Sequence, residues 1–486
     1  MKKIYIIFAL CLLTFASSAQ NVMTQNFMRY NPYFNSDNPA HHTPYKGYIG
    51  MPAVSNLNLS FSNTSLHYDK LLRTDSEGYP VSIDADKFIK KLSKQNNWLN
   101  LSLNEEILGF GFRAKSAFIT FSTRTRMNQY FKFSEDLFAF PLKGNMAFTG
   151  DDNYANPSAN ITLDAYQEFA LGVQVAITDK LYIGIKPKLL IGIANIRTRD
   201  LSAKIYTDPV DYAMTANYNV DISVASAIPI SYKDGNFNFN FDEITGNYTN
   251  VLRNIGFSLD LGAVYRINDN MGVGASLLDM GFIKWKTDGI RITSQLDNAG
   301  SFYSDGDFFF NGLTSDQISQ LIEGEEARTE LFDSLGNYFP VDIGNVSGEK
   351  INLTMRFSAE YYYQINDKHR FTAYFMGSII GKKLLPQFTL AYNGKLAKVF
   401  DICAHYTMKP NSFTNLGIGL GFDLAPIYLY FGTDNILGAI NPLNANTLNL
   451  QLGLVFKWGK IAEGKYTPEP RKKKKEKETT ETEKAG

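Results

Sequence analysis

Apolar and polar residues alternate along much of this chain, and the alternation is clearest between Thr447 and Trp458. Side chains two residues apart lie on the same face of a β-strand, so this segment has one apolar face and one polar face. The apolar face carries Leu448, Leu450, Leu452, Leu454, Phe456 and Trp458, and the other face carries Asn449, Gln451, Gly453, Val455 and Lys457. A face for lipid and a face for water predict a transmembrane β-strand.

The same pattern recurs along the chain and predicts fourteen strands in all, while totals of twelve and sixteen stay open. Residues 211–225 alternate weakly and are either a further strand or a hairpin within a long loop. The predicted strands are 54–65, 99–112, 116–126, 165–177, 181–195, 252–266, 271–282, 351–365, 370–380, 385–393, 397–408, 414–424, 427–433 and 447–458.

The connections between these segments alternate in length. Short turns such as Asn268-Asp269-Asn270 follow even-numbered strands, and longer links mostly follow odd-numbered ones. Bacterial outer-membrane barrels have short periplasmic turns and long extracellular loops. The expected fold is therefore all-β: a transmembrane antiparallel β-barrel of about 14 strands with long extracellular loops. In the fourth long loop, Thr314-Ser315-Asp316 predicts the start of a short surface helix.

The two ends of the chain differ in composition from this pattern. Lys2 and Lys3, an apolar run from Ile4 to Phe15 and a small-residue site ending at Ala19 are typical of a secretory signal peptide. We therefore expect export through the Sec pathway to the cell outer membrane. The predicted organisation is a signal peptide at 1–19, an N-terminal segment and possible plug at 20–47, the outer-membrane β-barrel at 48–459, and a disordered basic periplasmic tail at 460–486.

Composition supports a barrel and argues against a helical membrane protein, a nucleic-acid-binding protein and a disulfide-bonded secreted domain. The chain has 28 Tyr and 36 Phe but 3 Trp, and no segment offers the run of about 18 apolar residues that a transmembrane helix needs. Net charge is zero as written and −2 without Lys2 and Lys3, so nothing favours nucleic-acid binding. Without the signal peptide Cys403 is the remaining cysteine, which excludes an internal disulfide.

A fourteen-stranded barrel encloses a lumen that something must fill or gate. The segment 20–47 is irregular and rich in Asn, Pro and aromatic residues, and it is the candidate for a plug. Its plug candidates are Phe27, Tyr30, Tyr33 and Phe34. The alternative is an N-terminus attached loosely at the periplasmic rim.

Charged residues on the predicted inner faces are the candidates for lining the lumen: Glu168, Lys186, Lys188, Asp260, Arg356 and Glu360. Charges at membrane depth must be hydrated or paired. Such residues either line a path or lock a closed barrel, and the structural role is favoured.

Other chemistry finds little support in the sequence. Asp401, Cys403 and His405 alternate on one strand face, but no fourth ligand is evident, so we expect neither a metal nor a cofactor. No nucleophile elbow, phosphate loop or zinc helix occurs, and we predict that the protein is not an enzyme.

The last strand also carries a known pattern. Gln451-x-Gly453-x-x-Phe456-x-Trp458 resembles the C-terminal signal by which the barrel assembly machinery recognises its substrates, although the chain continues beyond it. More broadly, residues 50–56, 258–266 and 276–285 resemble an uncharacterised Bacteroidota family of outer-membrane barrels with a domain of unknown function. That family is distantly similar to the FadL-type fatty-acid channels and to the PorV and PorQ barrels of type IX secretion. The resemblance implies fourteen strands and a plugged lumen.

Two functions follow as hypotheses. The first is a plugged, porin-like transporter for a hydrophobic or amphipathic small molecule. The second is a barrel without transport activity that anchors its loops or tail for protein partners in a secretion or envelope complex. A transporter predicts an apolar pocket or lateral gap near the outer rim, whereas a scaffold predicts a sealed lumen.

Overall fold

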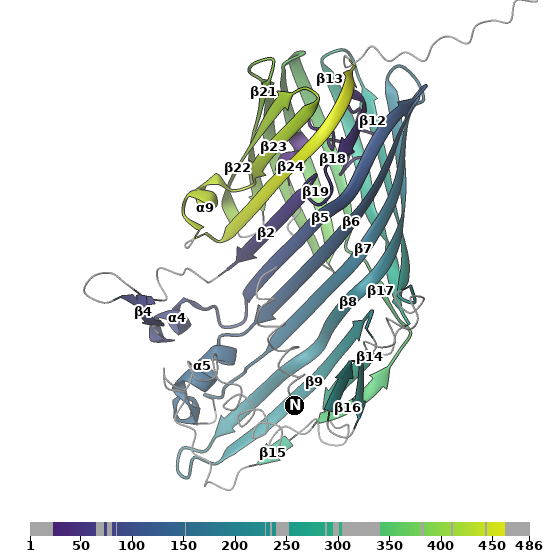
Figure 1. Cartoon of the computed structure of the whole chain (residues 1–486). Helices are drawn as coiled ribbons and strands as arrows, with labels where there is room; N and C mark the ends of the chain where they lie inside the picture. Colours follow the sequence, from purple (N-terminus) through teal and green to yellow (C-terminus); the bar gives the residue numbers. More distant parts are fainter. Residues whose placement is uncertain are drawn as a thin grey trace, which may run out of the picture.

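The computed structural model forms a closed antiparallel barrel of fourteen wall strands (Figure 1). This confirms the predicted fold class. The structure describes residues 23–64, 72–74, 80–83, 85–150, 152–228, 230–233, 236–239, 252–286, 289–294, 301–303, 341–380, 383–409, 412–442 and 445–461. The predicted signal peptide, most of the C-terminal tail and the predicted helix beginning near Thr314 lie outside these residues.

The first wall strand is interrupted. Its two parts, β1 and β2, both pair with β24 on one side and with β5 on the other, which closes the barrel and leaves no free edge. The strands of the wall are β1 (Tyr45–Gly50) with β2 (Leu57–Asn63), β5 (Asn97–Ala114), β6 (Ala117–Phe133), β7 (Ala159–Ala176), β8 (Leu181–Thr207), β12 (Ile255–Arg266), β13 (Met271–Trp285), β18 (Met355–Asn366), β19 (His369–Ile380), β20 (Lys383–Lys395), β21 (Phe400–Lys409), β22 (Ser412–Leu424), β23 (Ile427–Thr433) and β24 (Thr447–Lys460).

Short turns gather at one end of the barrel. The links β5–β6, β7–β8, β12–β13, β18–β19, β20–β21 and β22–β23 all lie there, as the sequence predicts. We call this the short-turn end and the opposite end the long-loop end. At the long-loop end, the β19–β20 and β21–β22 links are also short, whereas β8 and β12 are separated by residues 208–254.

The outer and inner faces of the wall differ as the alternation predicts. On β24, Leu450 is 48% exposed and Trp458 50%, while Gln451 and Val455 are fully buried inside. On β12, Phe257 is 60% exposed and its neighbour Ser258 is buried. An apolar belt around a polar interior suits a barrel whose outer face meets lipid.

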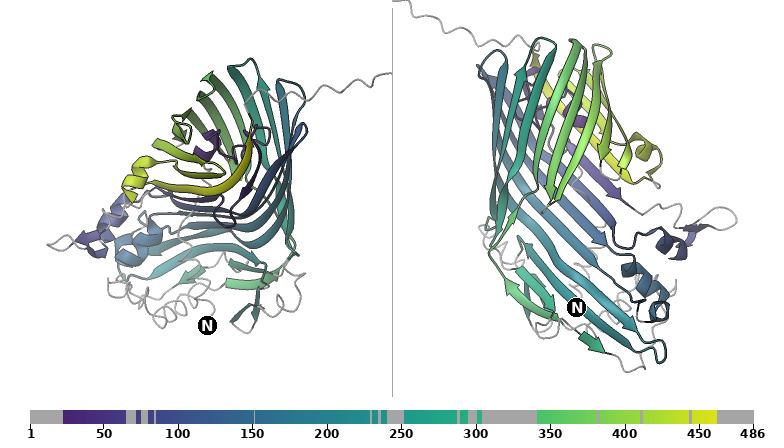
Figure 2. Two further views of the ribbon diagram at one scale, coloured as in Figure 1. Left: turned by 45° about the horizontal axis from the view of Figure 1, so that its top comes forward. Right: turned by 180° about the vertical axis from the view of Figure 1, so that it is seen from behind.

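One side of the barrel is much longer than the other (Figure 2). Strand β8 continues past β12 and pairs there with β9 (Met214–Ser226), the strand predicted weakly at 211–225. Strand β9 lies outside the fourteen wall strands and pairs in turn with β14 and β15. The further strands of the structure are β3 (Leu72–Thr74), β4 (Pro80–Ile83), β10 (Ile230–Lys233), β11 (Asn236–Phe239), β14 (Gly289–Ser294), β15 (Ser301–Tyr303), β16 (Val341–Val346) and β17 (Glu349–Asn352).

Helices are short and lie away from the wall or inside the lumen. They are α2 (Thr24–Phe27), α4 (Ala85–Lys91), α5 (Asp136–Lys143), the 3-10 helix η1 (Asn145–Phe148) and α9 (Ile436–Ile440). Among the described residues, none of these helices has the length and apolar character needed to cross a membrane.

The seam between β1 and β24 generates a prediction. Gly47 pairs with Trp458, and a side chain at Gly47 would overlap the Trp458 indole and approach the Gly111 carbonyl at 2.9 Å. Gly47→Val should therefore destabilise the closed barrel by roughly 1–3 kcal/mol, as overpacking does. Semi-native electrophoresis, which separates folded from heat-unfolded barrels, should show unfolding at a lower temperature. Gly344→Val on β16, where a side chain meets open space, is the control; equal behaviour of the two variants would contradict this account of the seam.

Candidate functional site

The N-terminal segment, residues 23–44, runs through the interior of the barrel and fills the part of the lumen toward the short-turn end. Two wall glycines leave room for it: a side chain at Gly184 would overlap the backbone of Pro39, and one at Gly262 would overlap Asn38. The four plug candidates Phe27, Tyr30, Tyr33 and Phe34 are all buried there, at 5, 6, 1 and 8% exposure. We call residues 23–44 the lumen segment.

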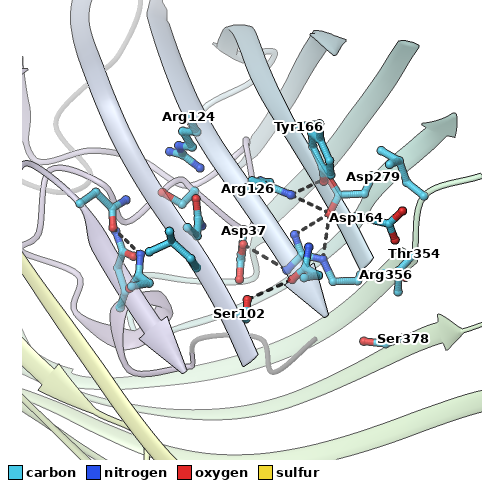
Figure 3. Close-up of a pocket in the computed structure, with 18 of the residues that line it drawn as sticks. Asp37, Ser102, Arg124, Arg126, Asp164, Tyr166, Asp279, Thr354, Arg356 and Ser378 are labelled. Atoms are coloured by element: carbon cyan, nitrogen blue, oxygen red, sulfur yellow. Dashed lines mark hydrogen bonds and ion pairs between the residues drawn. The ribbon is translucent and has the colours of Figure 1, made fainter. Parts of the chain in front are cut away.

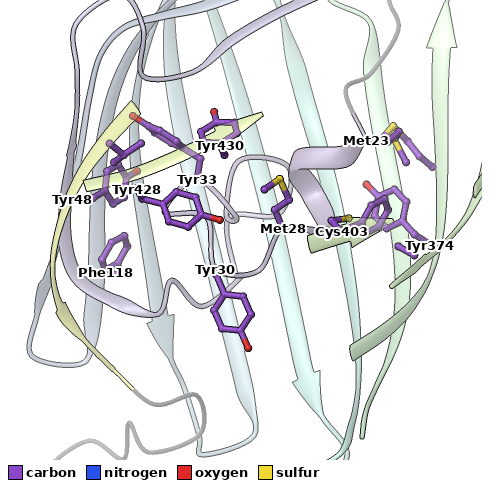
Figure 4. Packing of buried hydrophobic residues seen from close by; sticks show 14 residues of the cluster. Met23, Met28, Tyr30, Tyr33, Tyr48, Phe118, Tyr374, Cys403, Tyr428 and Tyr430 are labelled. Carbon is purple, nitrogen blue, oxygen red and sulfur yellow. The ribbon is translucent and has the colours of Figure 1, made fainter. Parts of the chain in front are cut away.

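An aromatic and sulfur-rich cluster holds one side of the lumen segment (Figure 4). Phe27 packs edge-on against Tyr374 of β19 at 5.4 Å between ring centroids, and Tyr33 does the same with Tyr48 of β1 at 5.0 Å. These T-shaped contacts are the favoured geometry for aromatic pairs. The cluster is completed by Met23, Met28, Tyr30, Phe118, Met376, Ala391, Cys403, Tyr428, Tyr430 and Val455.

The start of the lumen segment is anchored on one carboxylate, Asp434, in the link after β23. Asp434 accepts hydrogen bonds from the backbone N–H groups of Met23 and Thr24, from the Thr24 hydroxyl at 2.7 Å and from Gln451 Nε2 at 2.9 Å. Asp434 is almost fully buried, and the four donors around its two oxygens favour the ionised, acceptor-only form of the carboxylate. The anchor is therefore an ionised acceptor at neutral pH.

Further along, the lumen segment contacts the wall through polar groups. His41 Nε2 lies 2.6 Å from Glu360 Oε1 of β18, and its ring stacks on Phe34 at 4.3 Å. Tyr30 donates from its hydroxyl to the Asp367 carbonyl at the short-turn end, and Lys186 of β8 reaches the Ser36 carbonyl at 3.3 Å. The segment is thus bound by both apolar packing and exchangeable polar contacts.

A layer of paired charges crosses six neighbouring wall strands beside the lumen segment. The cations are Arg126 (β6), Lys188 (β8) and Arg356 (β18), and the carboxylates are Glu168 (β7), Asp260 (β12) and Asp279 (β13). We call these six residues the charge layer. Three positive and three negative side chains balance, as buried charges must.

Asp279 is the hub of the charge layer. Its carboxylate lies 2.7 Å from Lys188 Nζ, 2.8 Å from Arg356 Nη2 and 3.2 Å from Arg126 Nη1. Arg356 Nη1 also approaches Asp37 of the lumen segment at 3.6 Å. The charge layer therefore connects the wall to the lumen segment.

A β-bulge turns Asp279 inward. In the β12–β13 ladder, Leu259 pairs with Met280 and Leu261 with Leu277, so two residues of β13 oppose Asp260 alone. Asp279 has φ of 57°, a left-handed conformation that Asp tolerates better than most residues, and its N–H donates to Asp260. The bulge reverses which residues of β13 face the lumen and brings Asp279 inside.

A cavity of about 110 Å³ lies between the lumen segment and the long-loop end (Figure 3). Arg356, at its edge, is ten residues from the end of β18 at Asn366 in the short-turn end. Because a transmembrane strand takes about 9–11 residues, the cavity lies near the far boundary of the membrane span. Most of its lining residues are polar, and Leu103, Leu353 and the ring of Tyr166 are apolar. Four of the polar residues belong to the lumen segment: Gln25, Asn26, Ser36 and Asp37.

The predicted lumen-lining residues all lie on the inner side of the wall, but they do not form one site. Glu168, Lys188, Asp260 and Arg356 join the charge layer, whereas Lys186 and Glu360 contact the lumen segment directly. The sequence reasoning missed Asp279, Arg126 and Asp434. Strict alternation places Asp279 on the lipid-facing side of its strand. Because a carboxylate is costly there, its presence in the sequence could have indicated a bulge that turns it inward.

The remaining singled-out residues have structural contacts. Gln451 accepts from the Gln25 N–H at 3.1 Å, Gly453 lies against Ser55 and Tyr430, and Phe456 and Trp458 lie on the outer face. Their role as an assembly signal stays a prediction. Asp401, Cys403 and His405 all face inward; Asp401 accepts from Tyr428, and His405 contacts Thr24. Among the described residues, no group of three or more His, Cys, Asp or Glu side chains is arranged to hold a metal ion.

Fold and lumen together define an outer-membrane β-barrel with an N-terminal segment inside its lumen. The chain belongs to a family of unknown function, DUF5723, whose model matches residues 39–434. No curated protein matches the chain. Its resemblance to PorV and PorQ and a Bacteroidota origin stay predictions.

Solved structures that align with most of the chain include two toluene transporters and a FadL homologue. The toluene transporter TodX of Pseudomonas putida has a TM-score of 0.42 at 8% identity, over 91% of this chain and 98% of that one. A FadL homologue of Pseudomonas aeruginosa has a TM-score of 0.41 at 9% identity, over 91% and 100%. The toluene transporter TbuX of Ralstonia pickettii has a TM-score of 0.41 at 9% identity, over 92% and 100%. At these values neither substrate nor mechanism transfers to this chain.

The anchor at Asp434 predicts a local effect. Asp434→Ala removes the acceptor shared by Met23, Thr24 and Gln451, and each buried donor left unpaired costs about 1–3 kcal/mol. Hydrogen exchange of residues 23–28 should accelerate strongly, while the wall strands stay protected. Asp164→Ala is the control, because Asp164 pairs with Arg197 of β8 and not with the lumen segment. Unchanged exchange at 23–28 would refute the anchor.

The charge layer predicts a stability effect. Asp279→Asn leaves three cations facing an uncharged side chain, and breaking a buried pair in this way costs about 3–5 kcal/mol. Asp221→Asn on β9 removes the shared partner of Arg291 and Arg199, whose side chains are 47% and 41% exposed, and should cost clearly less, about 1 kcal/mol. Thermal unfolding in lipid vesicles measures the stability of both variants. Similar losses of stability for the two would show that Asp279 is no more important to the fold than a surface ion pair.

Proposed function

We propose that this protein is a plugged outer-membrane transporter in which the lumen segment is the movable plug. The observation that carries the proposal is that the segment meets the wall through many exchangeable polar contacts, at Asp434, Glu360, Lys186 and Arg356. Water can replace such contacts when the segment moves, because exposed polar groups regain hydrogen bonds in solvent.

The position of the cavity agrees with a transport path. It lies on the long-loop side of the lumen segment, and four residues of that segment form part of its lining. A solute that enters from the long-loop end therefore meets the plug directly. With the short turns in the periplasm, as bacterial barrels place them, this solute comes from outside the cell.

The sequence predicts a hydrophobic or amphipathic substrate, and the lining of the cavity does not favour a hydrophobic one. Sites for apolar ligands are lined mainly by hydrophobic and aromatic side chains. This cavity instead presents mainly amides, hydroxyls and paired charges, with Leu103, Leu353 and the ring of Tyr166 as its apolar surfaces. The geometry supports a polar solute.

The charge layer supports the second candidate, a sealed barrel that serves as a scaffold. It ties six strands together and reaches the lumen segment through Arg356 and Asp37. If the ion pairs of the charge layer and the Arg356–Asp37 contact never break, the lumen stays closed. The loops or the tail then provide the function by binding protein partners. Transport measurements separate the two candidates.

A reversible lock tests the transporter. A side chain at Gly262 would overlap Asn38, so cysteines at these two positions lie within reach of a disulfide. In Asn38→Cys/Gly262→Cys, oxidation should abolish the flux of small polar solutes into proteoliposomes, and reduction should restore it. Each single variant is a control: Gly262→Cys alone shows what the added side chain does to the lumen segment, and the native Cys403 is buried.

Deletion of residues 23–44 complements the lock. The transporter predicts that the deleted barrel conducts ions in planar bilayers far better than the full chain. A barrel that stays sealed after deletion, together with flux that does not respond to the lock, would exclude a movable plug and favour the scaffold.

A further inference from the structure

Three amide side chains at the cavity each leave one polar atom without a hydrogen-bond partner among the described residues. Gln25 of the lumen segment is 4% exposed and Asn58 of β2 is 2% exposed, and both line the cavity. Nε2 of Gln25 is without an acceptor, and Oδ1 of Asn58 is without a donor. Oδ1 of Asn104 on β5, another lining residue, is also without a donor. Buried polar groups are rarely left unpaired, so these atoms point to a ligand.

The chemistry of the unpaired atoms narrows the ligand. Gln25 offers a donor, so the ligand must accept a hydrogen bond; Asn58 and Asn104 offer acceptors, so it must also donate. A carboxylate or phosphate ester has acceptors but no donor for the two amide oxygens. An ammonium group has donors but no acceptor for Gln25. A hydroxyl group does both.

The charged residues at the cavity are already paired. Arg124 binds Glu106 at 3.0 Å, Arg126 and Arg356 bind Asp279, and Asp164 binds Arg197. An ionic ligand would have to break one of these pairs and leave a buried partner uncompensated, which is strongly unfavourable. Neutral ligands avoid this penalty.

We propose that the cavity binds a neutral polyhydroxylated small molecule, a sugar or polyol. This inference rests on the proposed function and names its substrate class. A volume of about 110 Å³ corresponds to roughly four waters at about 30 Å³ each, so the cavity takes one edge of a sugar ring while the rest of the molecule extends toward the long-loop end. Hydroxyls of the solute satisfy Gln25 and the two asparagines, and the ring of Tyr166 provides an apolar surface for its C–H groups.

Three probes of similar shape and different charge test the class. Equilibrium dialysis of the full chain in detergent measures saturable binding of labelled glucose, with gluconate and glucosamine as competitors. We expect glucose to bind at least about tenfold more tightly than either charged analogue, because only glucose leaves the ion pairs intact. Equal or tighter binding of a charged analogue overturns the proposal, and so does the absence of saturable glucose binding, which would mean that the cavity holds water only.

Matched variants locate the site. Asn58→Leu and Gln25→Met each remove one hydrogen bond and should weaken glucose binding by roughly three- to tenfold. Gln387→Met is the control: Gln387 on β20 is buried and its Oε1 is unpaired, but it does not line the cavity. Its glucose affinity should match that of the natural chain. If all three variants bind alike, the proposed site is wrong.

Two safeguards keep the test decisive. Should Asn58→Leu fail to fold, as judged by semi-native electrophoresis, Gln25→Met carries the test, since Gln25 lies outside the wall strands. Failure of this inference is also distinct from failure of the proposed function. A lock that controls flux in a barrel without glucose preference refutes the substrate class alone, whereas glucose binding to a barrel that never opens refutes transport alone.

Discussion

Charge inside a membrane barrel must be neutralised by partners, and this constraint shapes the lumen. Lys188 is almost fully buried and lies within 3.6 Å of Glu168, 2.6 Å of Asp260 and 2.7 Å of Asp279. No single strand can provide such a set, because alternate residues of one strand lie too far apart to meet one ammonium group. The partners come from neighbouring strands, so closure of the barrel and pairing of the charges depend on each other.

The lumen segment completes this arrangement. Its Asp37 approaches Arg356, its His41 meets Glu360, and its first residues occupy Asp434. Those contacts lie beside an aromatic cluster that excludes water from part of the lumen. Apolar packing holds the segment in the position seen in the structure. Water can replace each polar contact when the segment moves, which lowers the free-energy cost of the movement. Both properties are needed in a plug that holds and then moves.

Much of the fold follows from local patterns, and the candidate site does so only in part. Alternation predicted the wall strands and the exposed side of β24, because a period of two is a property of each strand alone. The prediction missed β1, a short strand of mixed burial, and it placed the first wall strand at 54–65, where the structure has β2 at Leu57–Asn63. Asp279 was missed because its inward direction depends on a bulge, which is set by pairing between β12 and β13. Asp434 lies in a link, where no period exists, and its role appears only once the lumen segment is in place.

The most direct test of a movable plug is a distance measurement between the lumen segment and the wall. Spin labels at Ser36→Cys, which lines the cavity, and at Asp269→Cys, in an exposed turn of the short-turn end, report this distance by pulsed electron resonance in lipid vesicles. We predict two populations, one at the distance of the structure and one shifted, with the shifted population growing when a permeating solute is added. A single narrow population that no solute changes would contradict the account and leave a permanently closed barrel.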